Sequence, residues 1–206
     1  MTVDHLFKES VLSDEYAYSI LYLLERQEAA DKETYRHCVN VKTLAMKIAK
    51  ALGGFSDREI LFLEWGCLLH DVGKLKIPYE ITAKPGPLST MEYEKMKTHP
   101  VEGCSIVATY PLPTQVTDII MFHHEHYNGT GYPSGLAQND IPLSARICSV
   151  VDAYDAMVSD RPYREAMSDE NALTEITKNS GTQFDPVVVR AFQSIRRNSF
   201  SINTFE

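Results

Sequence analysis

The sequence predicts an all-α protein. Apolar residues recur at helical spacing along most of its 206 residues. Ser56 with Glu59, and Ser89 with Glu92, match the capping-box pattern that begins a helix. We find no convincing alternation of apolar and polar residues of the kind that predicts a strand. The length fits one domain, and a hydrophobic content of 44% is enough for a packed core.

The first half of the chain divides into three helices and a loop. Apolar spacing predicts helices at 13–28 and 32–52, the second ending at Gly53-Gly54. The helix at 60–70 is apolar nearly all round, so we expect it to be central and buried. Residues 77–88 are rich in proline and glycine and are predicted to form a loop.

The second half continues in helices separated by proline and glycine. The helix that begins at Ser89 must bend or end at His99-Pro100, because proline disfavours helix at the residue before it. A short helix then runs to Tyr110, and Pro111 and Pro113 break it. The remaining predicted elements are a helix at 114–126, a loop at 128–133, a helix from Pro142 through Asp155 to about Ser159, one from Ser168 ending before Gly181, and a last one from Asp185-Pro186.

Composition excludes several classes of partner. The net charge of -8 and the pI near 5.4 argue against a nucleic-acid polymer, whose binders carry a basic face. We expect no membrane contact, since no apolar run approaches the ~18 residues of a span. No signal peptide is visible, and the four widely spaced cysteines suit buried thiols in a reducing compartment, so we expect a cytoplasmic location.

Five of the seven histidines form an ordered series with two aspartates. Imidazole and carboxylate together make the usual ligand set of a non-sulfur transition-metal site, and these seven groups exceed what one ion can hold. The series therefore predicts at least two metals, and such sites mostly hydrolyse phosphate esters or amides. Its members are His37, His70-Asp71, His99, His123-His124 and Asp152, whereas His5 and His126 fit no ligand pattern and are expected to be solvated.

Individual members carry different weight. His37 continues the apolar stripe of its helix and so points inward; alone it would suit a core histidine, but with its partners we interpret it as a ligand. Glu33 shares its face, although the start of a helix favours acidic residues anyway. Asp71 has two oxygens and could bridge two ions, or simply end its helix. Asp152 lies in a mostly apolar helix and needs a cation, and Asp155 either orients a histidine or lies at the surface.

In this order, the motifs resemble the HD-GYP family, a branch of the HD superfamily of metal-dependent phosphohydrolases. The resemblance covers roughly residues 30–190. Asn128 departs from the pattern, since aspartate is commoner there, but asparagine also suits a turn. The matching segments are 70–74, 84–86 with Leu88 and Glu92, His99, 123–125, 129–136, 141–143 with 145–147, 152–156, 161–164 and 184–186.

The resemblance implies a fold, a reaction and a set of site residues. The fold is an HD-domain helical bundle with a C-terminal helical extension; residues 31–206 form the catalytic domain and 1–30 a helical segment for packing or dimerisation. The reaction is hydrolysis of cyclic di-GMP to linear pGpG, GMP or both. Iron or manganese is held by His37, His70, Asp71, His99, His123, His124 and Asp152, with Glu33 for a third metal. Lys74 contacts the scissile phosphate, Tyr132 lines the substrate entrance, and Arg161 and Arg164 lie near the ligand phosphates.

The expected mechanism is attack on phosphorus by a hydroxide that bridges two metals, themselves bridged by Asp71, while Lys74 offsets the developing charge. One alternative is hydrolysis of another cyclic dinucleotide, such as 3'3'-cGAMP. A second is a non-catalytic module that binds a cyclic dinucleotide or a partner protein, for example a diguanylate cyclase, through the loop around Tyr132. Every ligand position is filled, which favours the enzyme. A homodimer is also expected.

Overall fold

The computed structural model describes residues 14–160 and 165–202, with side chains from Tyr16 to Arg196 outside that gap. The prediction of an all-α fold is confirmed. No strand occurs among the described residues, which contain only two isolated bridges, Asn128 with Ala137 and Ser180 with Phe184.

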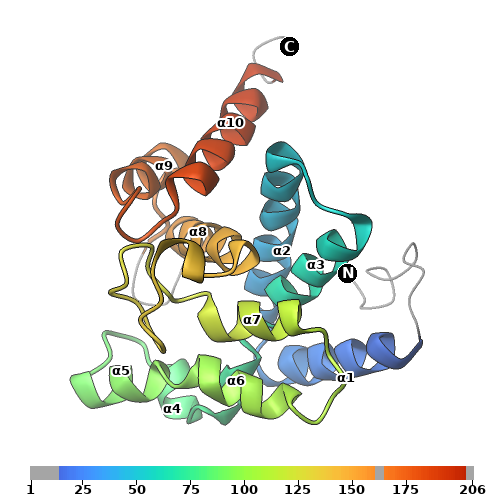
Figure 1. The fold of residues 1–206 in the computed structure, drawn as a ribbon. Coiled ribbons are helices and arrows are strands. Elements are labelled where there is room, and N and C mark those ends of the chain that lie inside the picture. The colour runs from blue at the N-terminus through green and yellow to red at the C-terminus, as the bar shows by residue number, and fades with distance from the viewer. Residues whose placement is uncertain (1–13, 161–164, 203–206) are drawn as a thin grey trace.

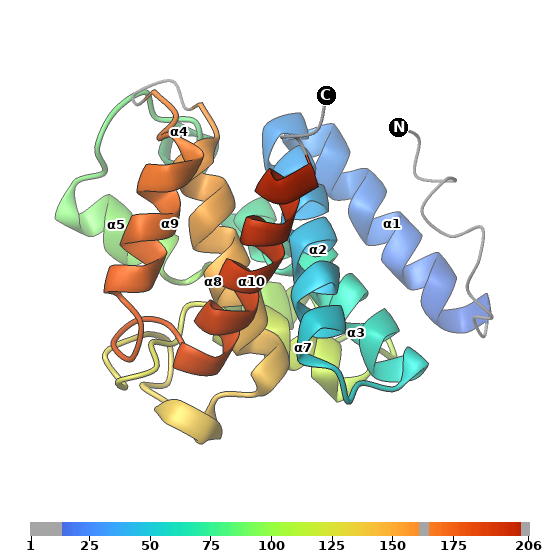
Figure 2. The same cartoon turned by 90° about the horizontal axis from the view of Figure 1, so that it is seen from above.

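The helices form a bundle with a central group and two ends. The central helices are α2 (Lys32–Leu52), α3 (Asp57–Leu69), α7 (Thr114–Phe122) and α8 (Leu143–Val158). Figure 1 shows α9 (Asp169–Lys178) and α10 (Pro186–Ile202) at one end, and α1 (Asp14–Ala30), α4 (Tyr79–Thr82), α5 (Thr90–Met96) and α6 (His99–Val107) at the other. Seen from above, α8, α10 and α2 lie between α9 and α1 (Figure 2). Helices α9 and α10 make up the C-terminal extension.

Two hydrophobic cores meet at α3. One core joins α2 and α8 to α9 and α10, and includes Ile48, Val151 and Phe192. The other joins α1 to α6 and α7, and includes Leu24 and Val116. Helix α3 supplies Leu63 and Cys67 to the first core and Phe62, Trp65, Leu68 and Leu69 to the second. The expectation that this helix is central and buried is confirmed, because it has a core on each side.

Helix α1 packs on the bundle through its apolar face. Ile20, Leu23 and Leu24 are fully buried in the second core, and the ring of Tyr16 lies 6.0 Å from that of Trp65. Homodimerisation through residues 1–30 stays a prediction. No helix among the described residues has the length and apolar character needed to cross a bilayer.

Three boundaries differ from those expected. The loop predicted at 77–88 contains the one-turn helix α4, and a 3₁₀ segment, η2 (Val72–Lys76), precedes it. The helix predicted at 114–126 ends at Phe122, because the chain turns at His123 and the side chain of Glu125 is used by the following loop. Pro142 lies just before α8 as its N-cap residue, and η3 (Gln138–Asp140) precedes it.

We predict that Leu24→Ala lowers the free energy of unfolding by about 2–5 kcal/mol, because it leaves a cavity in the second core. Tyr18→Ala on the same helix is the control, since Tyr18 is 74% exposed and its loss should cost less than about 0.5 kcal/mol. Urea denaturation of the three proteins measures both values. Equal stability of Leu24→Ala and wild type would contradict the packing of α1 described above.

Candidate metal centre

The seven candidate ligands come together where the two cores meet, and each occupies an identifiable place in a helix. His37 lies in α2 and Asp152 in α8. His70 and Asp71 follow α3, His99 begins α6, and His123 and His124 follow α7. Five of them therefore sit at helix ends, where the chain turns and a side chain can point into the space between helices.

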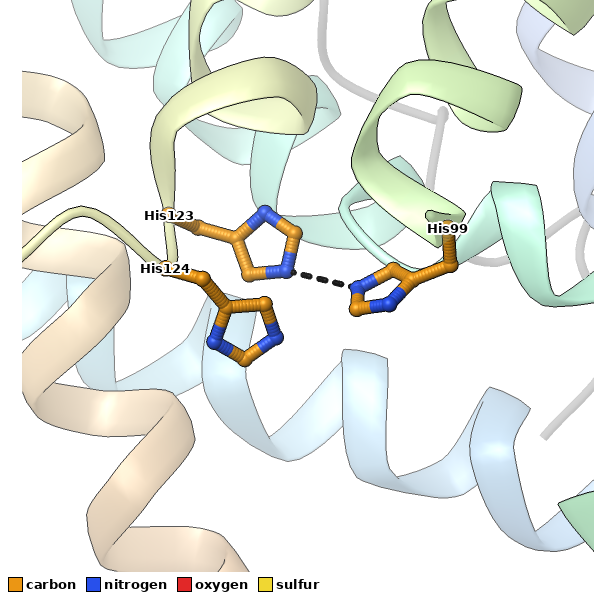
Figure 3. Close-up of side chains that lie close together, drawn as sticks. All are labelled: His99, His123 and His124. Atoms are coloured by element: carbon orange, nitrogen blue, oxygen red, sulfur yellow. Dashed lines mark hydrogen bonds between the residues drawn. The ribbon is translucent and has the colours of Figure 1, made fainter. Parts of the chain in front are cut away.

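His99, His123 and His124 form one group, whose rings turn toward one another in Figure 3. The Nε2 atoms of His99 and His123 lie 3.2 Å apart. His99 Nδ1–H donates to the carbonyl of Met96 at 2.8 Å, and His123 Nδ1–H donates to that of Ile120 at 3.0 Å. Each neutral ring therefore directs an Nε2 lone pair at the other, an arrangement that a cation between them would stabilise.

Burial keeps this group neutral. It lowers the pKa of His99 to about 4 and that of His124 to about 3, and it holds the pKa of His123 well below its usual value. Burial penalises the charged imidazolium, and neighbouring imidazoles add to the effect. All three rings thus present the unprotonated form that a metal requires.

His37, His70 and Asp152 form a second group. The Nδ1–H of His70 donates to the carbonyl of Cys67 at 2.8 Å, and its buried Nε2 has no hydrogen-bond partner among the described residues. This Nε2 lies 3.8 Å from Oδ1 of Asp152. A buried nitrogen without a partner is costly. A metal ligand whose other nitrogen is fixed by a carbonyl has this arrangement, so His70 fits the role.

His37 bridges two carboxylates. Its Nδ1 lies 2.7 Å from Oδ2 of Asp155 and its Nε2 lies 2.9 Å from Oδ1 of Asp152. Burial lowers the pKa of His37, but the hydrogen bonds to both aspartates outweigh it and raise that pKa to about 9. Asp155, for which orientation of a histidine and surface exposure were both open, is buried and holds the His37 ring.

Asp71 lies between the two groups. Its Oδ1 is 3.4 Å from Nε2 of His99, and its Oδ2 is 3.5 Å from Nε2 of His70. Burial alone would raise the pKa of Asp71, yet the ammonium of Lys74, 2.6 Å from Oδ2, and the surrounding histidines hold it well below its usual value. The same ion pair raises the pKa of Lys74 against the effect of burial, so both groups stay charged. One carboxylate oxygen therefore faces each histidine group.

The donor set fits two divalent cations with nitrogen and oxygen ligands. The unpartnered Nε2 of His70 and the facing lone pairs of His99 and His123 are the observations that favour this fit. Cys38, which we expected only as a buried thiol, also comes within ligand distance of His70 and Asp71. Burial raises the pKa of the Cys38 thiol and outweighs the opposing effect of Gln27, whose Nε2 donates to the sulfur at 3.0 Å, so the thiol stays protonated and fits a core role.

Two cavities border this centre. One, of about 160 Å³, is lined by Asp71 and Lys74 together with Asp31, Thr34 and Tyr79. The other, of about 240 Å³, lies beside His37 and is lined by Glu33, Arg36, Asn40, Ser159 and Asp160.

Glu33 is exposed one turn before His37 and belongs to neither histidine group. Arg161 and Arg164, expected near the ligand phosphates, lie outside the described residues, as does His5. His126, expected to be solvated, is instead partly buried, with Nδ1 3.1 Å from Oγ1 of Thr130.

The loop after α7 carries Tyr132 over the centre. The Tyr132 ring stacks on His124 with centroids 4.9 Å apart and planes at 25°. Glu125 organises this loop: its carboxylate accepts the backbone N–H groups of Ser134 at 2.6 Å, Gly135 at 3.1 Å and Leu136 at 3.1 Å. Sequence reasoning included Glu125 in a motif but gave it no role. A glutamate before a glycine-rich loop is the only signal that could have suggested one.

Two glycines set the distance between the chain segments that carry the ligands. A Cβ atom on Gly73 would lie 1.8 Å from the carbonyl oxygen of His99 and 2.5 Å from the backbone nitrogen of Gly103. A Cβ on Gly103 would lie 2.7 Å from Cγ2 of Ile120. Glycine therefore lets the backbone after Asp71 touch the backbone of α6.

We predict that Glu125→Gln lowers stability by about 1–3 kcal/mol, because an amide group would face a backbone N–H that now donates to a carboxylate. Faster hydrogen exchange of the amides of residues 134–136 should accompany the loss, measured by mass spectrometry. Glu80→Gln, the same substitution at an exposed position of α4, is the matched control and should change neither the stability nor the hydrogen exchange of residues 134–136. Unchanged exchange in Glu125→Gln would argue against its role in the loop.

Comparison with known proteins places the chain in a family. A sequence profile of the HD domain family matches residues 19–188. A cyclic di-GMP phosphodiesterase from Thermotoga maritima is 36% identical over 199 residues, which cover 95% of this chain and 53% of that protein. The 3'3'-cGAMP-specific phosphodiesterase 2 from Vibrio cholerae is 34% identical over 79% of this chain and 31% of its own length.

Solved structures agree on the fold. Bd1817, an HDG"Y"P protein from Bdellovibrio bacteriovorus, superposes with a TM-score of 0.67 at 26% identity, covering 79% of this chain and 52% of that one. The chain thus spans about half, or less, of the length of these relatives. Because the family profile covers most of the chain and the HD-GYP motifs occur in order, this chain belongs to the HD domain family, in its HD-GYP branch.

Proposed function

We propose that this chain is a metal-dependent phosphodiesterase that hydrolyses cyclic di-GMP to linear pGpG, GMP or both. The observation that carries the proposal is the position of Asp71, with one oxygen toward each histidine group. The name of the Thermotoga maritima relative supports the same substrate. Because the chain spans about half of that protein, the activity is proposed here from the site itself.

We propose two metal positions built from seven ligands. His37, His70 and Asp152 would serve one, and His99, His123 and His124 the other, with Asp71 between them. Iron or manganese suits imidazole and carboxylate donors, and Glu33, at the edge of the cavity beside His37, would serve a third ion. When bound, such ions lower the pKa of coordinated water and neutralise charge at phosphorus.

The chain's own residues orient the metal ligands and bind the phosphate groups of the substrate. Carbonyl groups fix the tautomers of His70, His99 and His123, so that each presents Nε2 to the centre. Lys74 keeps its proton beside Asp71 and lines the adjoining cavity, where its ammonium can offset charge on a non-bridging phosphate oxygen. Tyr132 covers His124 and limits access of water from the loop side. Arg161 and Arg164 are proposed as further phosphate contacts.

Three expectations about the surroundings of the protein stay predictions. A cytoplasmic location agrees with the free thiols of Cys38, Cys67, Cys104 and Cys148. A homodimer, and contact with a diguanylate cyclase or another signalling partner through the loop around Tyr132, follow from the family resemblance.

A second substrate is favoured by one specific observation. The Vibrio cholerae relative named as specific for 3'3'-cGAMP is about as similar to this chain as the Thermotoga maritima protein is. We expect cyclic di-GMP to be cleaved faster, and turnover of both dinucleotides by protein purified without oxygen and loaded with Fe(II) or Mn(II) measures the preference. Chromatography separates pGpG from GMP. Faster cleavage of 3'3'-cGAMP would identify it, rather than cyclic di-GMP, as the preferred substrate of the same phosphodiesterase reaction.

We predict that Asp71→Asn lowers kcat/KM by more than about tenfold, because the centre loses the charge that faces both histidine groups. Metal content, measured by inductively coupled plasma mass spectrometry, should fall as well. His126→Ala is the control, since His126 contacts Thr130 rather than the centre, and it should keep both metal and activity. Activity of Asp71→Asn within about tenfold of wild type would refute the bridging role.

A further inference from the structure

A series of side chains leads outward from His124 to the surface of α5. The ring of Tyr132 stacks on His124, and Nζ of Lys97 lies 5.9 Å from the centroid of the Tyr132 ring. The same Nζ lies 5.4 Å from the ring of Tyr93, one turn back on α5. We call Tyr93, Lys97 and Tyr132 the α5 rim. It joins a candidate metal ligand to two aromatic faces and a cation.

The cation of the rim is available to an anionic ligand. Among the described residues, the ion-pair partner of Lys97 is Glu94, whose Oε1 lies 2.7 Å away on a side chain that is 61% exposed. Exposed ion pairs of this kind contribute little to stability, so a phosphate can take the place of Glu94. The two ring faces hold the ammonium where it is, through cation–π contacts. The chain as a whole has a net charge of -8 and would repel an anion, so a positive charge beside the centre favours binding of an anion there.

The exposed ring of Tyr93 provides a second kind of contact. It is 50% exposed, although an aromatic ring gains from burial, and it lies at the outer end of the rim. Nucleobases stack on such rings whatever their identity, because every base has a π-face. A cyclic dinucleotide carries two phosphodiesters and two purine bases. If one phosphodiester lies beside Asp71 and Lys74, the other and its base must lie alongside the centre.

We propose that the α5 rim is a substrate subsite, in which Lys97 binds the phosphate that is not cleaved and Tyr93 stacks on a purine base. This inference rests on the proposed function, because it assumes a ligand with two phosphates. Tyr132 forms the wall between the subsite and His124. The rim would then distinguish a cyclic dinucleotide from a small phosphodiester, which has no second phosphate to offer.

The competing explanation is that Lys97 has only a structural role, a clip that holds the loop carrying Tyr132 against α5. Both roles use the same cation–π contacts, but they differ in what a substitution changes. A clip supports the position of Tyr132 over His124, so its loss would slow the cleavage of every substrate. A subsite affects only ligands that reach it. Lys97→Met removes the charge but keeps the apolar stem, and Tyr93→Leu removes the ring but keeps an apolar side chain.

The test compares two substrates with manganese-loaded protein: cyclic di-GMP, and methyl p-nitrophenyl phosphate, which has one phosphodiester and no base. We expect Lys97→Met to raise KM for cyclic di-GMP about tenfold, as befits loss of a charge-assisted contact, and to leave kcat/KM for the small diester within about twofold. Tyr93→Leu should raise the same KM several-fold, and Tyr93→Phe should restore it. The control is Lys95→Met, the same change on the same helix, where Lys95 faces Glu102 at 3.9 Å.

Either of two results would overturn the subsite. In the first, Lys97→Met lowers kcat/KM by the same factor for cyclic di-GMP and for the small diester. In the second, Lys97→Met and Lys95→Met have the same KM for cyclic di-GMP. Failure of the proposed function looks different, since wild type would then cleave the small diester but not cyclic di-GMP. In that case, equilibrium binding of cyclic di-GMP to the manganese-loaded wild type, Lys97→Met and Lys95→Met proteins is measured by calorimetry. Weaker binding in Lys97→Met alone would support the subsite, and absence of binding to every variant would overturn it.

Discussion

A buried carboxylate between two sets of imidazole lone pairs is the constraint on which this structure depends. Asp71 remains ionised in the interior, and Lys74 supplies only one compensating charge, on one oxygen. The second oxygen faces His99, and the Nε2 atoms around it have lone pairs and no protons to donate. Such an interior is stabilised by additional positive charge. The helices around it are arranged so that divalent cations can provide that charge.

The histidines are oriented by one recurring device. His70, His99 and His123 each donate Nδ1–H to the carbonyl three residues earlier, in Cys67, Met96 and Ile120. These carbonyls lie in the last turns of α3, α5 and α7, where a helix leaves carbonyl groups without intrahelical partners. One hydrogen bond thus gives a carbonyl in the last helical turn a partner and also fixes the tautomer of an imidazole. The helix termini and the candidate ligands are therefore parts of the same local structure.

Much of this could be predicted from the sequence, and the failures have physical causes. Capping boxes at Ser56 and Ser89 and apolar periodicity located most helices, because these signals are local. The seven candidate ligands could be grouped because a histidine series is rare in a core. The role of Glu125 and the early end of α7 could not, because they depend on how the following loop folds back, with Leu136 reaching Glu125 from 11 residues along the chain. The one-turn helix α4 is too short to show an apolar period. Asp155 stayed undecided because its partner His37 is 118 residues away.

The contact between Gly73 and α6 has a consequence for how such a protein can change over time. The separation of the segments bearing Asp71 and His99 is set by main chain against main chain, with no side chain in between. Side chains in either core can then be exchanged, and the helices can adjust by small shifts, while this spacing stays the same. Sequence drift is thereby tolerated in the hydrophobic interior and forbidden at two positions that carry no functional group at all.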